Sequence, residues 1–149
     1  MKDAAMKIRK LRTPAPRNGE PAARAIQAFI AEDTPFMMAL LSRILSRNER
    51  IAVAGSATDG WKALCYASSL EPDLVLMDLH MPGLDGAEVT RQLKQRLNPP
   101  TVFVLTSDDR PESRARCLAA GADAFLVKGT GLASQLQAAI QLFFPSTSR

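Results

Sequence analysis

The sequence contains few of the residues from which disulfide frameworks and histidine-rich metal centres are built. Its 149 residues include two cysteines and one histidine. Cys65 and Cys117 both fall within predicted helices, so we expect reduced thiols in the core of a cytoplasmic protein. The spacing around the single histidine, His80, offers no partner residues that would make its ring a metal ligand.

Long apolar runs are also missing. No stretch is long enough to span a bilayer, and the first apolar segment follows a polar and basic stretch at residues 1–24. We therefore expect neither a membrane span nor a signal peptide. No glycine-rich phosphate-binding loop follows the first predicted strand, so a cofactor-dependent small-molecule enzyme is the least favoured interpretation.

Positive charge is concentrated at the start of the chain. The formal net charge is +4, yet residues 1–24 alone hold seven basic residues against two acidic ones, which leaves the remainder near neutral. This stretch has three prolines and no sustained apolar period, so we expect a basic, disordered arm. Such an arm either contacts an acidic partner, a membrane surface or nucleic acid, or is a solvated extension without a specific role. No aromatic residue interleaves its charges, which argues against stacking on single strands.

From Ala25 onward, apolar strand patterns alternate five times with helical patterns. Short runs of β-branched and apolar residues predict strands at 26–31, 51–57, 73–78, 101–105 and 124–127. Apolar residues at helical spacing, with start and stop signals, predict helices at 34–47, 60–69, 86–97, 110–121 and 131–144. This alternation is typical of an α/β domain with a parallel sheet and helices on both faces. We expect one such domain over residues 25–144 and a short tail at 145–149.

Polar residues stand at the carboxyl ends of four of these strands. Glu32 and Asp33 follow the first strand, Asp78 ends the third, and Thr106 and Lys128 end the fourth and fifth. In a parallel sheet these ends share one edge, so we expect the side chains to converge. Three carboxylates in a small cleft repel one another unless a cation compensates, and oxygen ligands favour Mg²⁺.

Such a cleft is suited to phosphoryl transfer. Mg²⁺ and Lys128 would neutralise charge on the phosphoryl oxygens, and Thr106 would supply a hydroxyl donor. Asp78, presented at a strand end beside a Pro82-Gly83 turn, would be the in-line nucleophile that forms an acyl phosphate.

Four segments, taken in order and with their spacing, resemble the receiver domain of two-component response regulators. The resemblance covers residues of about 25 to 144. It rests on IAED at 30–33, LVLMDLHMPGLDG at 74–86, VLTS at 104–107 and GADAFLVK at 121–128. It implies a flavodoxin-like, doubly wound (βα)5 fold, a three-layer sandwich with a five-stranded parallel sheet in the order 2-1-3-4-5.

The resemblance also implies a role for each matching residue. Asp78 would accept a phosphoryl group from a histidine kinase or a histidine phosphotransfer protein. Asp33, Asp78 and the backbone carbonyl of His80 would bind Mg²⁺, with Glu32 acting through water. Thr106 and Lys128 would each contact a phosphoryl oxygen, and Phe125 would be the switch aromatic that turns inward when Thr106 moves. The alternative for Phe125 is plain core packing.

The sequence departs from the family pattern near this cleft. Gly129 follows Lys128 where many receivers have a proline, and Ser107 stands where a smaller residue is common. His80 and Asp108 occupy positions at which the family tunes the lifetime of the phosphoryl group. Asp108 could orient an attacking water, whereas the sign of the effect of His80 stays open.

Two surfaces are candidates for partner binding. Phe36 and Met38 fall off the apolar stripe of their helix close to Asp33, so they are either a docking patch for a partner or scattered surface residues. The resemblance places the output face on the fourth helix, the fifth strand and the fifth helix, including Arg114, Arg116 and 131–144.

No further module follows the predicted domain. We therefore expect a stand-alone, non-enzymatic, cytoplasmic switch that signals through contact with a downstream protein or a second copy of the chain, without direct DNA binding. Two alternatives stay open: the receiver part of a longer DNA-binding transcription regulator, and an adaptor that acts without phosphorylation.

Overall fold

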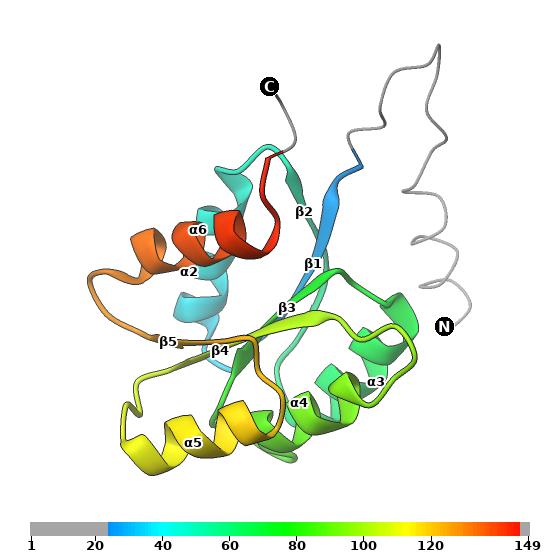
Figure 1. The fold of residues 1–149 in the computed structure, drawn as a ribbon, viewed down its shortest axis with the longest axis vertical. Helices are drawn as coiled ribbons and strands as arrows, with labels where there is room; N and C mark the ends of the chain where they lie inside the picture. Colours follow the sequence, from blue (N-terminus) through cyan, green and yellow to red (C-terminus); the bar gives the residue numbers. More distant parts are fainter. Residues whose placement is uncertain (1–23, 147–149) are drawn as a thin grey trace.

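A computed structural model describes residues 24–146 of the chain and contains one parallel sheet of five strands (Figure 1). The strands lie in the order β2-β1-β3-β4-β5, and every neighbouring pair is parallel. This confirms the predicted sheet and its order. Their bounds are β1 Ile26–Ala31, β2 Ile51–Ala57, β3 Leu74–Asp78, β4 Thr101–Thr106 and β5 Ala124–Val127.

Within residues 24–146, five helices cover the two faces of the sheet. In Figure 1, α2 and α6 lie on one face and α3, α4 and α5 on the other, which makes three layers. The helices are α2 Pro35–Ser46, α3 Gly60–Leu70, α4 Gly86–Lys94, α5 Pro111–Ala119 and α6 Leu132–Phe143. The doubly wound architecture expected from the alternating pattern is therefore the observed one.

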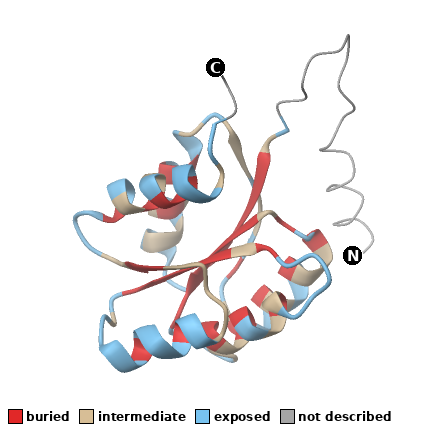
Figure 2. Ribbon diagram, viewed as in Figure 1, coloured by how far each residue is buried: buried red, intermediate tan, exposed pale blue. Residues whose placement is uncertain are grey.

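The sheet separates the core into two apolar clusters, and its three central strands β1, β3 and β4 are buried on both sides, whereas the edge strand β2 is mostly half-buried (Figure 2). In β3, side chains alternate between the clusters: Val75 and Met77 face α3, α4 and α5, whereas Leu74 and Leu76 face α2 and α6. This burial explains why β3 reads as a continuous apolar run rather than an alternating one. A rigid central strand of this kind fixes the position of the carboxylate at its end.

Helix starts agree with the capping residues in the sequence. The carboxylates of Asp59 and Asp85 accept hydrogen bonds from the backbone N–H groups of Lys62 and Glu88 at the starts of α3 and α4. Pro35 and Pro111 open α2 and α5, where a missing N–H costs nothing.

Three expectations for individual elements were wrong. Helix α4 ends at Lys94 rather than near residue 97, because Leu97 is 94% exposed and packs against nothing that would extend the helix. Cys65 is exposed, since α3 buries the small residues Ala63 and Ala67 instead; Cys117 is buried as expected. Met38 is half-buried and packs against the core, whereas Phe36 is 74% exposed.

The start of α3 presses against the loop that follows β3. The Gly60 N–H donates a hydrogen bond to the carbonyl of Pro82 at 3.0 Å, and a Cβ at Gly60 would lie 1.7 Å from the carbonyl oxygen of Leu84. Gly83 has a φ of +81°, and a Cβ there would lie 2.8 Å from the Trp61 ring. These contacts determine the path of the chain directly after Asp78.

The predicted disordered arm at 1–24 lies outside the described residues except for Arg24, and the tail at 145–149 is described only to residue 146. The Arg24 guanidinium forms an ion pair with Asp73 at 3.2 Å, at the amino-terminal edge of the sheet. Among the helices of residues 24–146, none has the length and apolar character needed to cross a membrane.

Candidate functional site

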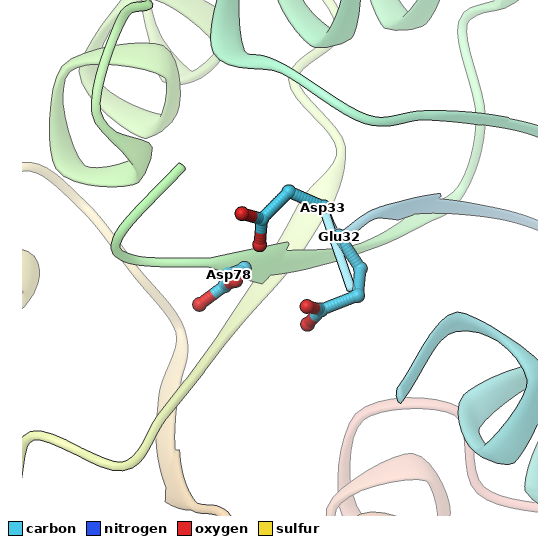
Figure 3. Close-up of side chains that lie close together, drawn as sticks. All are labelled: Glu32, Asp33 and Asp78. Atoms are coloured by element: carbon cyan, nitrogen blue, oxygen red, sulfur yellow. The ribbon is translucent and has the colours of Figure 1, made fainter. Parts of the chain in front are cut away.

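Three carboxylates gather at the carboxyl ends of β1 and β3 (Figure 3). Glu32 and Asp33 follow β1, Asp78 ends β3, and each contributes an oxygen that lies within 4.8 Å of the other two. Glu32 is fully buried and Asp78 is only 6% exposed, while Asp33 is open to solvent. The parallel pairing of β1 with β3 brings these sequence-distant residues together.

Lys128, directly after β5, supplies the positive charge of the cluster. Its Nζ lies 2.9 Å from Glu32 Oε1 and 3.3 Å from Asp78 Oδ1. The other Glu32 oxygen, Oε2, accepts a hydrogen bond from the backbone N–H of Thr34 at 3.1 Å. Both Glu32 oxygens therefore have partners within the protein, and the predicted convergence of these residues is observed.

Asp78 has a pKa well above that of an ordinary aspartate. Burial is the main cause; the nearby Lys128 opposes it, the charge of Glu32 adds to it, and together they raise the pKa of Asp78 to about 7. Lys128 alone therefore does not compensate for three carboxylates in so little space. A bound cation would favour the charged form of Asp78.

Thr106 is the last residue of β4. The residue before it, Leu105, pairs with Asp78 of β3, so Thr106 lies beside Asp78. Its side chain is 1% exposed, and its Oγ1 accepts a hydrogen bond from the backbone N–H of Asp108 at 3.0 Å. Thr106 lines an open cleft of about 490 Å³ together with Asp33, Thr34, Asp78, His80, Ser107, Asp108 and Lys128. The cleft thus contains the predicted acceptor, hydroxyl and lysine.

A second carboxylate on the rim of this cleft has many partners. Asp108 accepts hydrogen bonds from the Nε and Nη2 of Arg110, both at 2.8 Å, and from the Ser113 hydroxyl at 2.6 Å. The His80 Nε2 lies 3.0 Å from Asp108 Oδ2. The bonds from Arg110, Ser113 and His80, in that order of importance, hold the pKa of Asp108 far below its usual range. Its oxygens are engaged within the protein rather than free to orient a water.

Phe125 in β5 is 8% exposed, so its ring is already turned toward the interior. The guanidinium of Arg114 in α5 lies over the ring, 5.3 Å from the centroid. This cation–π contact joins two residues of the face that the resemblance assigns to output.

The donor set of the acidic cluster fits Mg²⁺. All three side chains offer carboxylate oxygens close together, which suits a hard divalent ion. Asp33 and Asp78 are the carboxylates best placed to bind such an ion directly, because both oxygens of Glu32 already have partners.

Arg110 and Ser113 belong to this site, yet the sequence reading missed them. The sequence pattern at Arg110 and Pro111 was interpreted only as a helix start, whereas the first turn of α5 folds back onto Asp108. The signal that could have found them is a carboxylate followed two residues later by an arginine and five residues later by a serine.

Comparison with known proteins agrees with this geometry. The profile of the response regulator receiver domain matches residues 28–141. The chain is 35% identical over 118 residues to the response regulator GacA of Pseudomonas aeruginosa, covering 79% of this chain and 55% of that protein. It is 38% identical over 99 residues to protein-glutamate methylesterase/protein-glutamine glutaminase 2 of Methanospirillum hungatei JF-1, covering 65% of this chain and 28% of that protein.

A solved structure shows the same fold. The signal receiver domain of the putative response regulator NarL from Mycobacterium tuberculosis superposes with a TM-score of 0.75 at 28% identity, covering 82% of this chain and 98% of that one. The chain spans only about half, or less, of the length of the two curated relatives, so the shared part is the receiver and not the remainder of those proteins.

Proposed function

The chain belongs to the response regulator receiver domain family, whose general role is phosphorylation-dependent signalling, and we propose that Asp78 is its phospho-acceptor. The donor is a histidine kinase or a histidine phosphotransfer protein. The observation that carries the proposal is the cluster itself: an almost buried carboxylate at the end of the central strand, with a lysine at 3.3 Å and two further carboxylates within reach.

The transfer is a displacement at phosphorus. An oxygen of the Asp78 carboxylate forms a P–O bond as the P–N bond of phosphohistidine breaks, and the imidazole nitrogen keeps the electron pair of that bond. The product is an acyl phosphate on Asp78. No other co-reactant is needed.

Other cleft residues serve the incoming phosphoryl group. Lys128 is held by Glu32 at the mouth of the cleft, and its ammonium neutralises charge on one phosphoryl oxygen. Thr106 lies at the neighbouring strand end and donates its hydroxyl to another oxygen. When bound to Asp33, Asp78 and the backbone carbonyl of His80, Mg²⁺ supplies further compensation of the phosphoryl charge.

Signalling then requires a change of conformation on a surface that a partner can bind. We assign this surface to the face made by α5, β5 and α6, where Phe125 packs beneath Arg114. The partner is a downstream protein or a second copy of the chain, in the cytoplasm, and the domain itself catalyses only its own phosphorylation and dephosphorylation. The phosphoryl group adds negative charge, and this charge shifts the equilibrium between two conformations of this face.

Intact-mass analysis with Mg²⁺ and a small acyl-phosphate donor tests the acceptor. The wild type is expected to gain one phosphoryl group and Asp78→Asn none. Asp109→Asn, an exposed carboxylate outside the cleft lining, is the matched control and should react as the wild type does. Equal labelling of Asp78→Asn, or no adduct on a folded and rapidly quenched wild type, would overturn the proposal and favour an adaptor that acts without phosphorylation.

A further inference from the structure

The Asp108 carboxylate links the loop after β3 to the first turn of α5. It accepts hydrogen bonds from Arg110 in its own loop and from Ser113 in the first turn of α5, and it pairs with His80 in the loop after β3. We refer to these four residues as the Asp108 cluster. The Asp108 side chain is 13% exposed, whereas the side chains of Arg110 and His80 are largely exposed, so the bond to Ser113 is the most buried contact of the cluster.

The cluster has one end in the phospho-acceptor cleft and one end outside it. His80 and Asp108 line the cleft together with Asp78, whereas Ser113 does not. Ser113 is 5% exposed, and its hydroxyl lies 2.6 Å from the Asp108 carboxylate. This short bond is thus a direct connection between the cleft and α5.

Thr106 is tied to the same cluster through the backbone. The N–H of Asp108 donates to Thr106 Oγ1 at 3.0 Å. A Thr106 hydroxyl that moved toward a phosphoryl group on Asp78 would lose this bond, and the backbone at residue 108 would be released. The Asp108 side chain is then free to leave Ser113.

We propose that Asp108 is a positioning residue that couples the state of the phospho-acceptor cleft to the first turn of α5 through Ser113. This inference rests on the proposed function of Asp78. A phosphoryl group brings negative charge toward the Asp108 carboxylate and competes with it for His80, so both effects loosen the cluster. The loosened turn is followed at once by Arg114, which covers Phe125.

Asp108 as a water-orienting base is the rival role, and the two roles predict different responses from Ser113. A base acts on water at the phosphoryl group, so loss of the Ser113 hydroxyl would then change the rate at which phosphorylated Asp78 is hydrolysed, but neither the labelling rate nor the response of α5 to beryllofluoride. A coupling residue transmits in both directions, because an interaction between two sites is reciprocal. A substitution of Ser113 must therefore also change the rate at which Asp78 is labelled in the cleft.

The test uses Ser113→Ala, with Ser113→Thr as the variant that keeps the hydroxyl. Ser46→Ala is the matched control, because its hydroxyl bonds the Arg43 carbonyl at 2.8 Å in α2, on the opposite face of the sheet. Two quantities are measured on the full chain: the rate at which an acyl-phosphate donor labels Asp78, and amide hydrogen exchange in α5 with and without Mg²⁺ and beryllofluoride.

In the wild type, beryllofluoride with Mg²⁺ should speed exchange at residues 112–116. In Ser113→Ala, exchange there should already be fast, the added response should shrink, and the labelling rate should change by about fivefold. Ser113→Thr should restore both quantities, and Asp108→Asn should behave as Ser113→Ala does. A Ser113→Ala protein that matches Ser46→Ala in both measurements, while Asp78 is still labelled, overturns the coupling alone. A wild type that is never labelled overturns the proposed function as well.

Discussion

Asp78 and Asp108 line the same cleft, yet their surroundings act on them in opposite directions. Asp78 is nearly buried among other carboxylates, and its pKa is raised to about 7. Asp108 receives hydrogen bonds from an arginine, a serine and a histidine, and its pKa is held far below the usual range. The two side chains are similarly buried, 6% and 13% exposed, but burial is the largest effect on the pKa of Asp78, whereas the hydrogen bonds to Asp108 outweigh the effect of its burial.

The difference distinguishes a carboxylate suited to chemistry from one suited to a structural role. The oxygens of Asp78 have one cation nearby and no complete set of donors, so they retain capacity for a metal ion and a phosphoryl group. The oxygens of Asp108 are already engaged. In this cleft the carboxylate with few donors is the better candidate for chemistry, and the carboxylate with many donors is the better candidate for positioning.

The largest expected effect comes from removing the cation beside Asp78. Lys128→Met should slow phosphorylation of Asp78 by an acyl-phosphate donor by about 100-fold, because a preorganised charge facing the phosphoryl oxygens is lost. Timed intact-mass measurements would give the rate. Lys94→Met is the control. It removes an ammonium group that lies 2.8 Å from Asp123, and neither residue lines the cleft. A Lys128→Met protein as fast as the control would contradict this role.

The second largest effect is expected in how the free energy of unfolding depends on pH, because of the raised pKa of Asp78. A raised pKa gives stability that is complete below the unfolded value of 3.8 and is lost as the pH rises through about 7. Asp78→Asn avoids that loss, so without divalent ions it should be more stable than the wild type by about 2 kcal/mol at about pH 8 and by little at about pH 4. Urea unfolding at the two pH values measures this. A difference that does not depend on pH would exclude the raised pKa.

A smaller effect is expected on the affinity for Mg²⁺ when Glu32 is substituted. Glu32→Gln removes one charge from the cluster but leaves Asp33 and Asp78, so Mg²⁺ should bind about tenfold more weakly. The rise in melting temperature with Mg²⁺ concentration measures this affinity without any phosphoryl donor. Glu71→Gln, at the opposite edge of the sheet, should leave the affinity unchanged.

The smallest effect is expected from Asp108. Its lowered pKa gives stability that is present above the unfolded value and is lost as the pH falls through the folded one. Asp108→Asn should therefore be slightly less stable than the wild type at about pH 7, and the difference should have begun to shrink at about pH 3, just below the unfolded value. Because Arg110 and His80 are largely exposed, added salt should also reduce the difference. Thermal unfolding at both pH values tests this.

The fold and the cluster around Asp78 could be predicted because both depend on strong local signals. Strands buried on both faces give apolar runs with clear ends, and parallel pairing forces those ends to one edge of the sheet. The positions of Glu32, Asp78, Thr106 and Lys128 follow from this rule alone. The residues at the strand ends were therefore found without any knowledge of side-chain contacts.

The Asp108 cluster could not be predicted because it depends on how loops and a helix end meet. His80, Arg110 and Ser113 approach Asp108 from two loops and one helix turn, and no periodic pattern relates them. The exposure of Cys65 was not predicted for a different reason: three of the four buried residues of α3 are glycine or alanine, so the size of an apolar side chain does not indicate which side of this helix faces the core.

Trp61 gives the protein an optical probe of its own. It is the single tryptophan of the chain, it is 61% exposed, and its ring rests against Gly83, three residues after His80. Emission from an indole depends on its immediate surroundings, and here those surroundings include the loop that follows Asp78. Fluorescence titrations with Mg²⁺ or a phosphoryl mimic can therefore follow this loop in solution without any attached dye.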